Sequence, residues 1–243
     1  NGDLIEMSIG MNISIDKIKK TLLLKQSSSK DWAMILGGNY SGWQIFFKGK
    51  PNVDKISDTS KQRFNSFGLT GCLTIYKSII NDAFISANNG SCEDSINLIG
   101  THGKNVSLKV INAFADAVDA DFSFLSIKSL DILNVGNDCF DVSGGNYKLN
   151  YASLAKCNDK AISVGEKSHF IADNILIDNA AIGISSKDSS KTTVFNLDVH
   201  DVSLCAEVKQ KKQEFGGDKL IIGQSNCLSS IEVDSDSILL VKK

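Results

Sequence analysis

The sequence predicts an all-β protein: a single-stranded, right-handed parallel β-helix of about 22 residues per coil with an N-terminal cap. Short apolar pairs recur at a nearly fixed interval, and one residue separates the two members of each pair, which is the period of a strand. The right hand follows the general rule for parallel crossovers. The pairs are Ile96/Leu98, Val118/Ala120, Phe140/Val142, Ile162/Val164, Ile182/Ile184 and Leu204/Ala206, and their first members lie 22, 22, 22, 20 and 22 residues apart.

A second apolar series supports the same coil. Its members are Val110, Ile132, Leu154, Ile177 and Val199, at intervals of 22, 22, 23 and 22 residues. The first series contains a single interval of 20 residues. We interpret it as the sum of two changes: the loop of Glu166 and Lys167 gains one residue, and the turn after Ile177 loses three. Coils of this kind stack about 4.8 Å apart, so equivalent side chains form ladders along the long axis.

Asparagines mark the corners between strands. Asn112 and Asn134 lie 22 residues apart, and Asn179 holds a similar corner. Asn tolerates the left-handed backbone that a sharp corner requires. The alternative all-β fold is a sandwich, but a sandwich gives no reason for a register that repeats at a fixed interval.

The chain divides into two parts in this interpretation. Residues 1–68 form the N-terminal cap, the first irregular coils and a long loop over 48–68, and residues 69–243 form the regular coils with a C-terminal closure. Strands are expected at Met7/Ile9, Ile13/Ile15 and Ile45/Phe47. Residues 17–30 are expected to form a short helix or a polar loop.

Composition excludes some classes of function. The net charge is −2, which argues against a nucleic-acid-binding protein, and hydrophobic residues make up 42% of the chain, enough for a sizeable core. No apolar run is long enough to span a membrane as a helix. The six cysteines form no CxxC pair and no small-scaffold spacing, so we expect most of them to be buried free thiols.

Four short segments resemble a known family. Asp116-Ala-Val-Asp119, Asn137-Asp138-Cys139, Asn158-Asp159-Lys160 and Ile184-Ser-Ser-Lys187 are similar in order and spacing to the motifs of polygalacturonase-type glycosidases. Those enzymes are right-handed parallel β-helices of the pectin-lyase-like superfold, and their motifs read Asn-Thr-Asp, Asp-Asp, Gly-His-Gly and Arg-Ile-Lys. The match covers about residues 94–190.

The resemblance implies the fold but not the reaction. Asn137 stands where the second motif of the family has its first Asp. The third segment has Lys160 and lacks the His of the family motif. The fourth segment keeps Lys187 but has no Arg. The chain also resembles uncharacterised bacterial β-helix proteins that are linked to surface polysaccharides. This second resemblance favours an extracellular or cell-surface location.

The residue between two inward apolar residues of a strand points outward. In the successive coils these residues are Asn97, Asp119, Asp141, Ser163, Gly183 and Cys205. One edge of the solenoid is therefore expected to be acidic in its first coils and of mixed charge in the later ones. It carries Asp94, Asp116, Asp119, Asp121, Asp138 and Asp141, and then Lys160, Glu166, Lys167, Lys187 and Asp188.

Stacking Asp119 on Asp141 about 4.8 Å apart is costly unless something compensates the two charges. A shared proton, a bound Ca²⁺ or a facing lysine would do so. Ca²⁺ is the one cofactor that the sequence leaves open, and no residue is assigned as a metal ligand. The candidate catalytic residues are Asp119, Asp138, Asp141, Lys160 and Lys187. The candidate substrate-binding residues are Asp116, Asp121, Ser163, Glu166, Lys167 and Asp188.

Two reactions on a polysaccharide or oligosaccharide fit these residue types. Carboxyl groups about 5–5.5 Å apart suit a retaining glycosidase, and a spacing of about 6.5–9.5 Å suits an inverting one. A lyase would need Ca²⁺ on a uronate and a lysine base, Lys160 or Lys187, with a lowered pKa. The alternative is a non-catalytic carbohydrate-binding or structural β-helix, because Asp at a corner such as 116 or 138 also bonds to turn amides.

Overall fold

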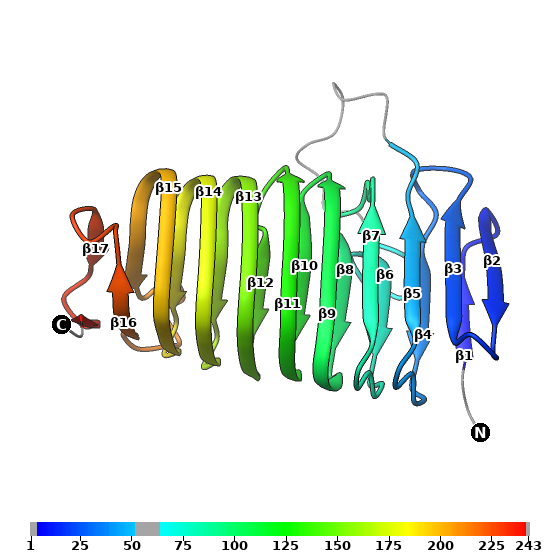
Figure 1. Cartoon of the computed structure of the whole chain (residues 1–243), viewed down its shortest axis with the longest axis horizontal. Coiled ribbons are helices and arrows are strands. Elements are labelled where there is room, and N and C mark those ends of the chain that lie inside the picture. The colour runs from blue at the N-terminus through cyan, green and yellow to red at the C-terminus, as the bar shows by residue number, and fades with distance from the viewer. Residues whose placement is uncertain (1–3, 52–63, 242–243) are drawn as a thin grey trace.

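The computed structural model describes residues 4–51 and 64–241. Over these residues the chain is all-β without a helix, and parallel coils of about 22 residues stack into a solenoid of about 10 turns. Figure 1 shows the coils side by side along the long axis, with the two chain ends at opposite ends of the stack. The predicted fold class is therefore confirmed in its parallel coiled architecture.

The first strands pair antiparallel and the rest pair parallel. Strand β1 (Leu4–Met7) pairs with β4 (Ala33–Leu36), and β2 (Met11–Asp16) with β3 (Thr21–Gln26). Parallel stacking begins with β3 on β5 (Gln44–Lys48) and β4 on β6 (Gly71–Tyr76).

The expectation of a helix or polar loop over residues 17–30 was wrong. Leu22 and Leu24 of β3 are fully buried, and their alternation is that of a strand packed on the core. The expected loop over 48–68 lies largely outside the described residues. Its flanks, 49–51 and 64–70, contain no strand.

The remaining strands continue the parallel stack. They are β7 (Phe84–Asn88), β8 (Asp94–Ile99), β9 (His102–Ala113), β10 (Asp116–Asp121), β11 (Phe124–Val135), β12 (Phe140–Ser143), β13 (Asn146–Gly165), β14 (His169–Lys187), β15 (Lys191–Lys209), β16 (Lys219–Ser225), β17 (Ile231–Val233) and β18 (Ile238–Val241). At the C-terminal end β17 pairs with β15 and β18 with β16, so the tail extends the stack. No helix of the described residues is long and apolar enough to cross a membrane.

The short interval predicted between Ile162 and Ile182 does not exist in the structure. Ile162 pairs with Ile184, and Ile182 pairs with Lys160. The inward pair of that coil is therefore Ile184 and Ser186 rather than Ile182 and Ile184, and in the next coil it is Ala206 and Val208. The one extra residue in the coil is absorbed by a register shift between the pairings of Cys157 and Lys160, so no three-residue loss is needed.

The corner asparagines are where the sequence placed them. Asn112, Asn134 and Asn179 have φ angles of 59°, 63° and 64°, which is the left-handed region. The Asn134 side-chain amide donates to Oδ1 of Asn112 at 2.7 Å, so the two corners are also bonded to each other along the stack.

The prediction of mostly free thiols was wrong. Cys72 is bonded to Cys92 and Cys139 to Cys157, and the free cysteines of the described residues are Cys205 and Cys227. The bonded residues are separated by 20 and 18 positions along the chain, slightly less than one coil. The chain therefore returns almost to its starting point and brings the two Cα atoms to 5.3 and 5.5 Å.

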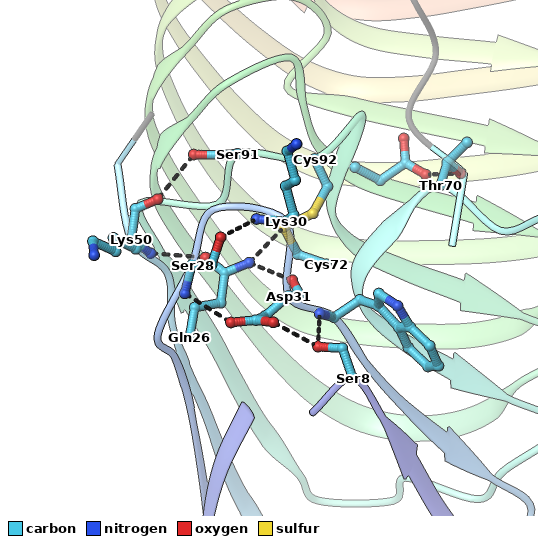
Figure 2. Close-up of a disulfide and its surroundings, with 12 residues drawn as sticks. Ser8, Gln26, Ser28, Lys30, Asp31, Lys50, Thr70, Cys72, Ser91 and Cys92 are labelled. Atoms are coloured by element: carbon cyan, nitrogen blue, oxygen red, sulfur yellow. Dashed lines mark hydrogen bonds between the residues drawn. A yellow bond between two sulfur atoms is a disulfide. The ribbon is translucent and has the colours of Figure 1, made fainter. Parts of the chain in front are cut away.

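Figure 2 shows the first disulfide among side chains from several N-terminal segments. The Gln26 side-chain amide donates to the Asp31 carbonyl oxygen at 2.5 Å and approaches Cys72 Sγ at 3.6 Å. The Gln26 Oε1 atom accepts the Lys50 backbone N–H at 2.7 Å. Both ends of this buried amide are thus bonded, as buried polar groups require.

Candidate functional site

One outward row of side chains runs along consecutive coils. Asp119 pairs in register with Asn97 on one side and with Asp141 on the other. Pairing continues from Asp141 to Ser163 and then to Ser185 and Glu207, with one residue contributed by each coil. We call these six residues the outward row: Asn97, Asp119, Asp141, Ser163, Ser185 and Glu207. Asp119 and Asp141 are partly exposed, and the other four side chains are buried beneath neighbouring groups.

The last two members of this row differ from those predicted from the sequence. Gly183 and Cys205, which were expected there, are out of register with Ser163, because Ser163 pairs with Ser185 and Ser185 with Glu207. Their assignment followed from taking Ile182/Ile184 as the inward pair, which shifts the register by two residues. Keeping the period of the earlier coils, counted from Ser163, would have found Ser185 and Glu207.

The centre of the row is a pair of neighbouring carboxyl groups. Asp119 and Asp141 are both partly exposed. The Asn97 amide donates to Asp119 Oδ2 at 3.2 Å, and the buried Oδ1 of Asp141 has no hydrogen-bond partner. Burial, followed by the charges of Asp94, Asp121 and Asp141, raises the pKa of the Asp119 carboxyl well above its usual range.

Protonation of Asp119 is the compensation that its raised pKa favours. The raised pKa keeps Asp119 protonated at mildly acidic pH, beside a carboxylate oxygen of Asp141 that lacks a donor. Within the described residues, no lysine lies within ion-pair distance of either carboxyl group. The same part of the chain contains no group of three or more His, Cys, Asp or Glu side chains arranged to hold a metal ion, so the Ca²⁺ alternative gains no ligand set.

A second row lies three residues before the outward row in successive coils and comprises Asp94, Asp116, Asp138 and Lys160. Asp116 Oδ1 accepts the backbone N–H of Asp138, and Asp138 Oδ1 accepts that of Lys160, both at 2.9 Å. Each carboxyl group therefore ties its own coil to the next one. These contacts give Asp116 and Asp138 the corner role that was the alternative in the sequence analysis.

Lys160 lies within contact distance of two carboxylates. Its ammonium group is 3.5 Å from Asp138 Oδ1 and also pairs with Asp159. Burial lowers the Lys160 pKa, but the hydrogen bonds and charges of Asp159 and Asp138 outweigh burial and raise the pKa overall. A lyase base needs the opposite shift, so this environment suits charge neutralisation rather than proton abstraction.

Lys187 reaches back over one coil to the outward row. Its side chain is buried, and its ammonium group donates to Ser163 Oγ at 2.7 Å. A Cβ atom at Gly165 would lie 3.0 Å from Lys187 Cε, so the glycine leaves room for the lysine stem. Ser163 in turn pairs with Asp141. The structure thus brings one cation to the coil beside the two carboxyl groups.

The other predicted binding residues lie around a loop over residues 210–217. The buried Asp188 accepts the backbone N–H groups of Lys211 and Lys212 at 2.7 Å each, which is a structural role in holding the loop. Glu166 forms an ion pair with Lys212. The Lys167 ammonium lies 5.6 Å from the centroid of the Phe215 ring.

The predicted residue Asp121 lies nearer the pair. Burial first, and then the charges of Asp141 and Glu166, raises its pKa to about 6. The structure therefore brings Asp121 near Asp141 and Glu166, whereas Lys167 and Asp188 contact the loop over residues 210–217.

Two residues of the outward row, Ser185 and Glu207, were not predicted from the sequence. Glu207 is buried, and its Oε1 atom accepts the Ser185 hydroxyl at 2.6 Å. Its Oε2 atom accepts the Lys209 ammonium at 2.7 Å. This end of the outward row is fully hydrogen-bonded, whereas the Asp119/Asp141 end is not.

The carboxyl groups with raised pKa values should make the protein more stable at mildly acidic pH than at alkaline pH. Burial is the main cause that raises the pKa of Asp94 to about 8 and that of Asp116 to about 7. The folded state thus binds protons more tightly than the unfolded state, so stability is full near pH 4 and falls as pH rises to about 8. We expect a melting temperature at least about 5 °C lower at pH 8.5 than at pH 5.

Calorimetry across this range, at constant ionic strength, measures the effect. Asp94→Asn keeps the shape of the side chain and removes the carboxyl group with the highest of these pKa values, so its stability profile should be flatter. A wild-type melting temperature that stays level or rises toward pH 8.5 would contradict the burial of neutral carboxyls.

Neither a protein-family model nor a curated protein matches the chain. Among solved structures, the catalytic domain of a GH87 α-1,3-glucanase in complex with tetrasaccharides is similar over 85% of this chain and 56% of that one, at 11% sequence identity and a TM-score of 0.28. A likeness of this size assigns no activity to the present chain.

Proposed function

We propose that the protein is a polysaccharide-acting glycoside hydrolase whose reacting pair is Asp119 and Asp141. The observation that carries the proposal is the direct register of the two residues on β10 and β12, combined with the raised pKa of Asp119. In-register parallel strands lie about 4.8 Å apart, close to the carboxyl spacing of about 5–5.5 Å in retaining glycosidases.

The two carboxyl groups divide the chemistry between them. Asp119, protonated because of its raised pKa, donates its proton to the glycosidic oxygen as the bond to the leaving sugar breaks. The Asp141 carboxylate attacks the anomeric carbon and forms a glycosyl ester. Water then cleaves the ester, with Asp119, now ionised, taking the proton from the water, so that both residues return to their first state.

The neighbouring charged groups set the electrostatic environment of the pair. Lys187, held on Ser163, supplies a positive charge beside the pair, and Asp121 supplies a further carboxyl group on the same strand as Asp119. An extracellular or cell-surface location belongs to the proposal, because polysaccharides are met there and because disulfides persist in oxidising compartments.

Assay of the wild-type protein on a panel of neutral and acidic polysaccharides tests the proposal. We expect release of reducing ends, with the anomeric configuration of the product retained in proton NMR. The rate should fall on the alkaline side as Asp119 loses its proton, well above pH 4. An unsaturated, ultraviolet-absorbing product would identify a lyase and overturn the hydrolase assignment.

One observation favours a second candidate, a non-catalytic β-helix that binds carbohydrate or acts as a scaffold. Asp116 and Asp138 are engaged by backbone amides of the next coil, as in a purely structural ladder. Absence of product from every polysaccharide of the panel, under conditions where the protein is folded, would favour this candidate.

A further inference from the structure

The outer surface of β13–β16 carries a groove of about 540 Å³ that is apart from the outward row. Along β13, the corner residue Lys156, with a φ of 57°, lies between the groove residue Tyr151 and Ser163 of the outward row. The two sites therefore face different sides of the same coil. The volume is within the usual range for small-molecule sites, about 300–1,000 Å³.

An in-register row of four residues forms one wall of the groove. Tyr151 pairs with Asn174, Asn174 with Asn196, and Asn196 with Gln224, one residue from each of four successive strands. Neighbours in such a row are about 4.8 Å apart, so the wall presents one aromatic ring and three amides at a regular interval along the solenoid axis.

The amides are partly held in place and partly free. Asn196 Nδ2 donates to Asn174 Oδ1 at 3.0 Å and to the Asp173 carbonyl oxygen at 3.2 Å, which fixes the orientation of its side chain. Asn196 Oδ1 and the exposed Gln224 amide have no hydrogen-bond partner within the described residues. Held side chains with spare hydrogen-bonding atoms bind a ligand at low cost in conformational entropy.

A second row of lining residues, two positions further along the same segments, is also preorganised. Asn226 Nδ2 donates to Asp198 Oδ1 at 2.7 Å, and Asn226 Oδ1 accepts the Val199 backbone N–H at 2.9 Å. Asp198 is thereby held with a carboxylate oxygen available as an acceptor. Leu176, from β14, adds an apolar contact beside it.

The charge of the groove selects among ligands. None of its lining residues is a lysine or arginine, and Asp198 is the one carboxylate. A phosphate backbone or a polyuronate would meet the negative charge of Asp198, whose neighbour His200, with Nε2 3.3 Å from Asp198 Oδ1, compensates that charge only when protonated. The Tyr151 ring, 45% exposed, offers a flat apolar face of the kind that stacks on a sugar ring, next to amides that can bond to hydroxyl groups.

We propose that this groove is a binding site for a neutral oligosaccharide, separate from the Asp119/Asp141 pair. A chain bound there lies along the solenoid axis, with one sugar on Tyr151 and its hydroxyl groups on Asn196, Gln224 and Asp198. The site holds a glucan-type chain without reacting with it. It goes beyond the proposed hydrolase activity and does not require it.

Titration calorimetry with cellohexaose, laminarihexaose and hexagalacturonate tests the site. The full chain carrying Asp119→Asn and Asp141→Asn serves as the background, so that hydrolysis cannot disturb the measurement. We expect binding of at least one of the two neutral hexasaccharides, and weaker or no binding of hexagalacturonate. Tyr151→Ala should weaken binding about tenfold or more, and Tyr151→Phe should leave it within about twofold, because the ring is kept.

Phe124→Ala is the matched control. Its ring is 48% exposed, close to that of Tyr151, but lies on β11 outside the groove, so its loss should leave binding unchanged. Gln224→Ala should weaken binding severalfold. Lack of binding by both neutral probes, tighter binding of hexagalacturonate, or equal affinity of Tyr151→Ala and the background protein would overturn the site. Because the background protein lacks both reacting carboxyl groups, failure of the hydrolase proposal does not alter this result.

Discussion

Asp141→Asn is expected to lower the turnover of polysaccharide by about 100-fold or more without lowering the melting temperature. The substitution keeps the shape of the side chain but removes the carboxylate that attacks the anomeric carbon, and acid, base and nucleophile contributions of this kind are worth about 10²–10⁴ in rate. It also removes a charge that raises the pKa of its in-register neighbour Asp119, so where Asp119 is ionised the folded state should gain about 0.2–1 kcal/mol.

Asp119→Asn should reduce turnover to a similar degree for a different reason. The amide cannot donate the proton that the raised pKa of Asp119 provides, so the leaving sugar departs without protonation. A substrate with a good leaving group, such as a nitrophenyl glycoside, should recover most of its bond-cleavage rate in this variant. The same substrate should not rescue Asp141→Asn, because the attacking group is missing there.

Asp131→Asn is the matched control for both variants. Asp131 is also a partly exposed aspartate on a parallel strand, β11, and pairs with Lys109 and Ser153 outside the outward row. Its turnover should equal that of the wild type. The Asp119 and Asp141 variants could instead be more stable than the wild type and turn over substrate at the wild-type rate. That result would show that the pair has no catalytic role and is only a tolerated repulsion.

Replacement of both Cys139 and Cys157 by alanine is expected to cost about 3 kcal/mol of unfolding free energy. The disulfide closes a loop with a sequence separation of 18, and the chain-entropy relation gives about this value for such a loop. For a protein of this length the loss corresponds to a decrease of about 6–12 °C in melting temperature. Calorimetry of the oxidised protein measures it.

The two free cysteines provide the control for this pair. Cys205→Ala with Cys227→Ala removes the same number of sulfur atoms but no disulfide, and should cost about 1 kcal/mol or less. Reduction of the wild-type protein should reproduce the loss seen in the Cys139/Cys157 variant, together with that of the Cys72–Cys92 bond. Equal destabilisation by the two double variants would mean that the Cys139–Cys157 bond does not stabilise the fold.

The coil architecture could be predicted because its cause is local and repeated. Each coil buries the same kind of side chain at the same place, so Val118, Phe140 and Ile162 recur once per coil and their pairing in the structure follows that interval. The corner residues Asn112 and Asn134 were predictable for the same reason. In two coils the rule was applied to the wrong pairs, Ile182/Ile184 and Leu204/Ala206, because an inserted residue made two registers look alike in the sequence.

The candidate site was predicted in its centre and missed at one end. Asp119 and Asp141 were found because aspartate in the middle of a strand is unusual. Ser185 and Glu207 carry no such signal, since serine and glutamate are ordinary surface residues until the register places them next to Ser163. The local role of Asp138 was also undecided until the structure showed the Lys160 backbone N–H on its carboxylate.

By itself the sequence determined the repeat, and therefore the parallel stack, the inward apolar ladders and the register of the central acidic pair. The tertiary structure alone decided which groups meet across the ends of a coil: the two disulfides, the reach of Lys187 over Gly165 to Ser163, and the groove between Tyr151 and Gln224. The physical reason is the closure of the coil. The repeat period determines which residues lie above and below a given residue in the neighbouring coils. The backbone bends at the corners determine which residues of one coil approach each other. A single inserted residue changes these bends.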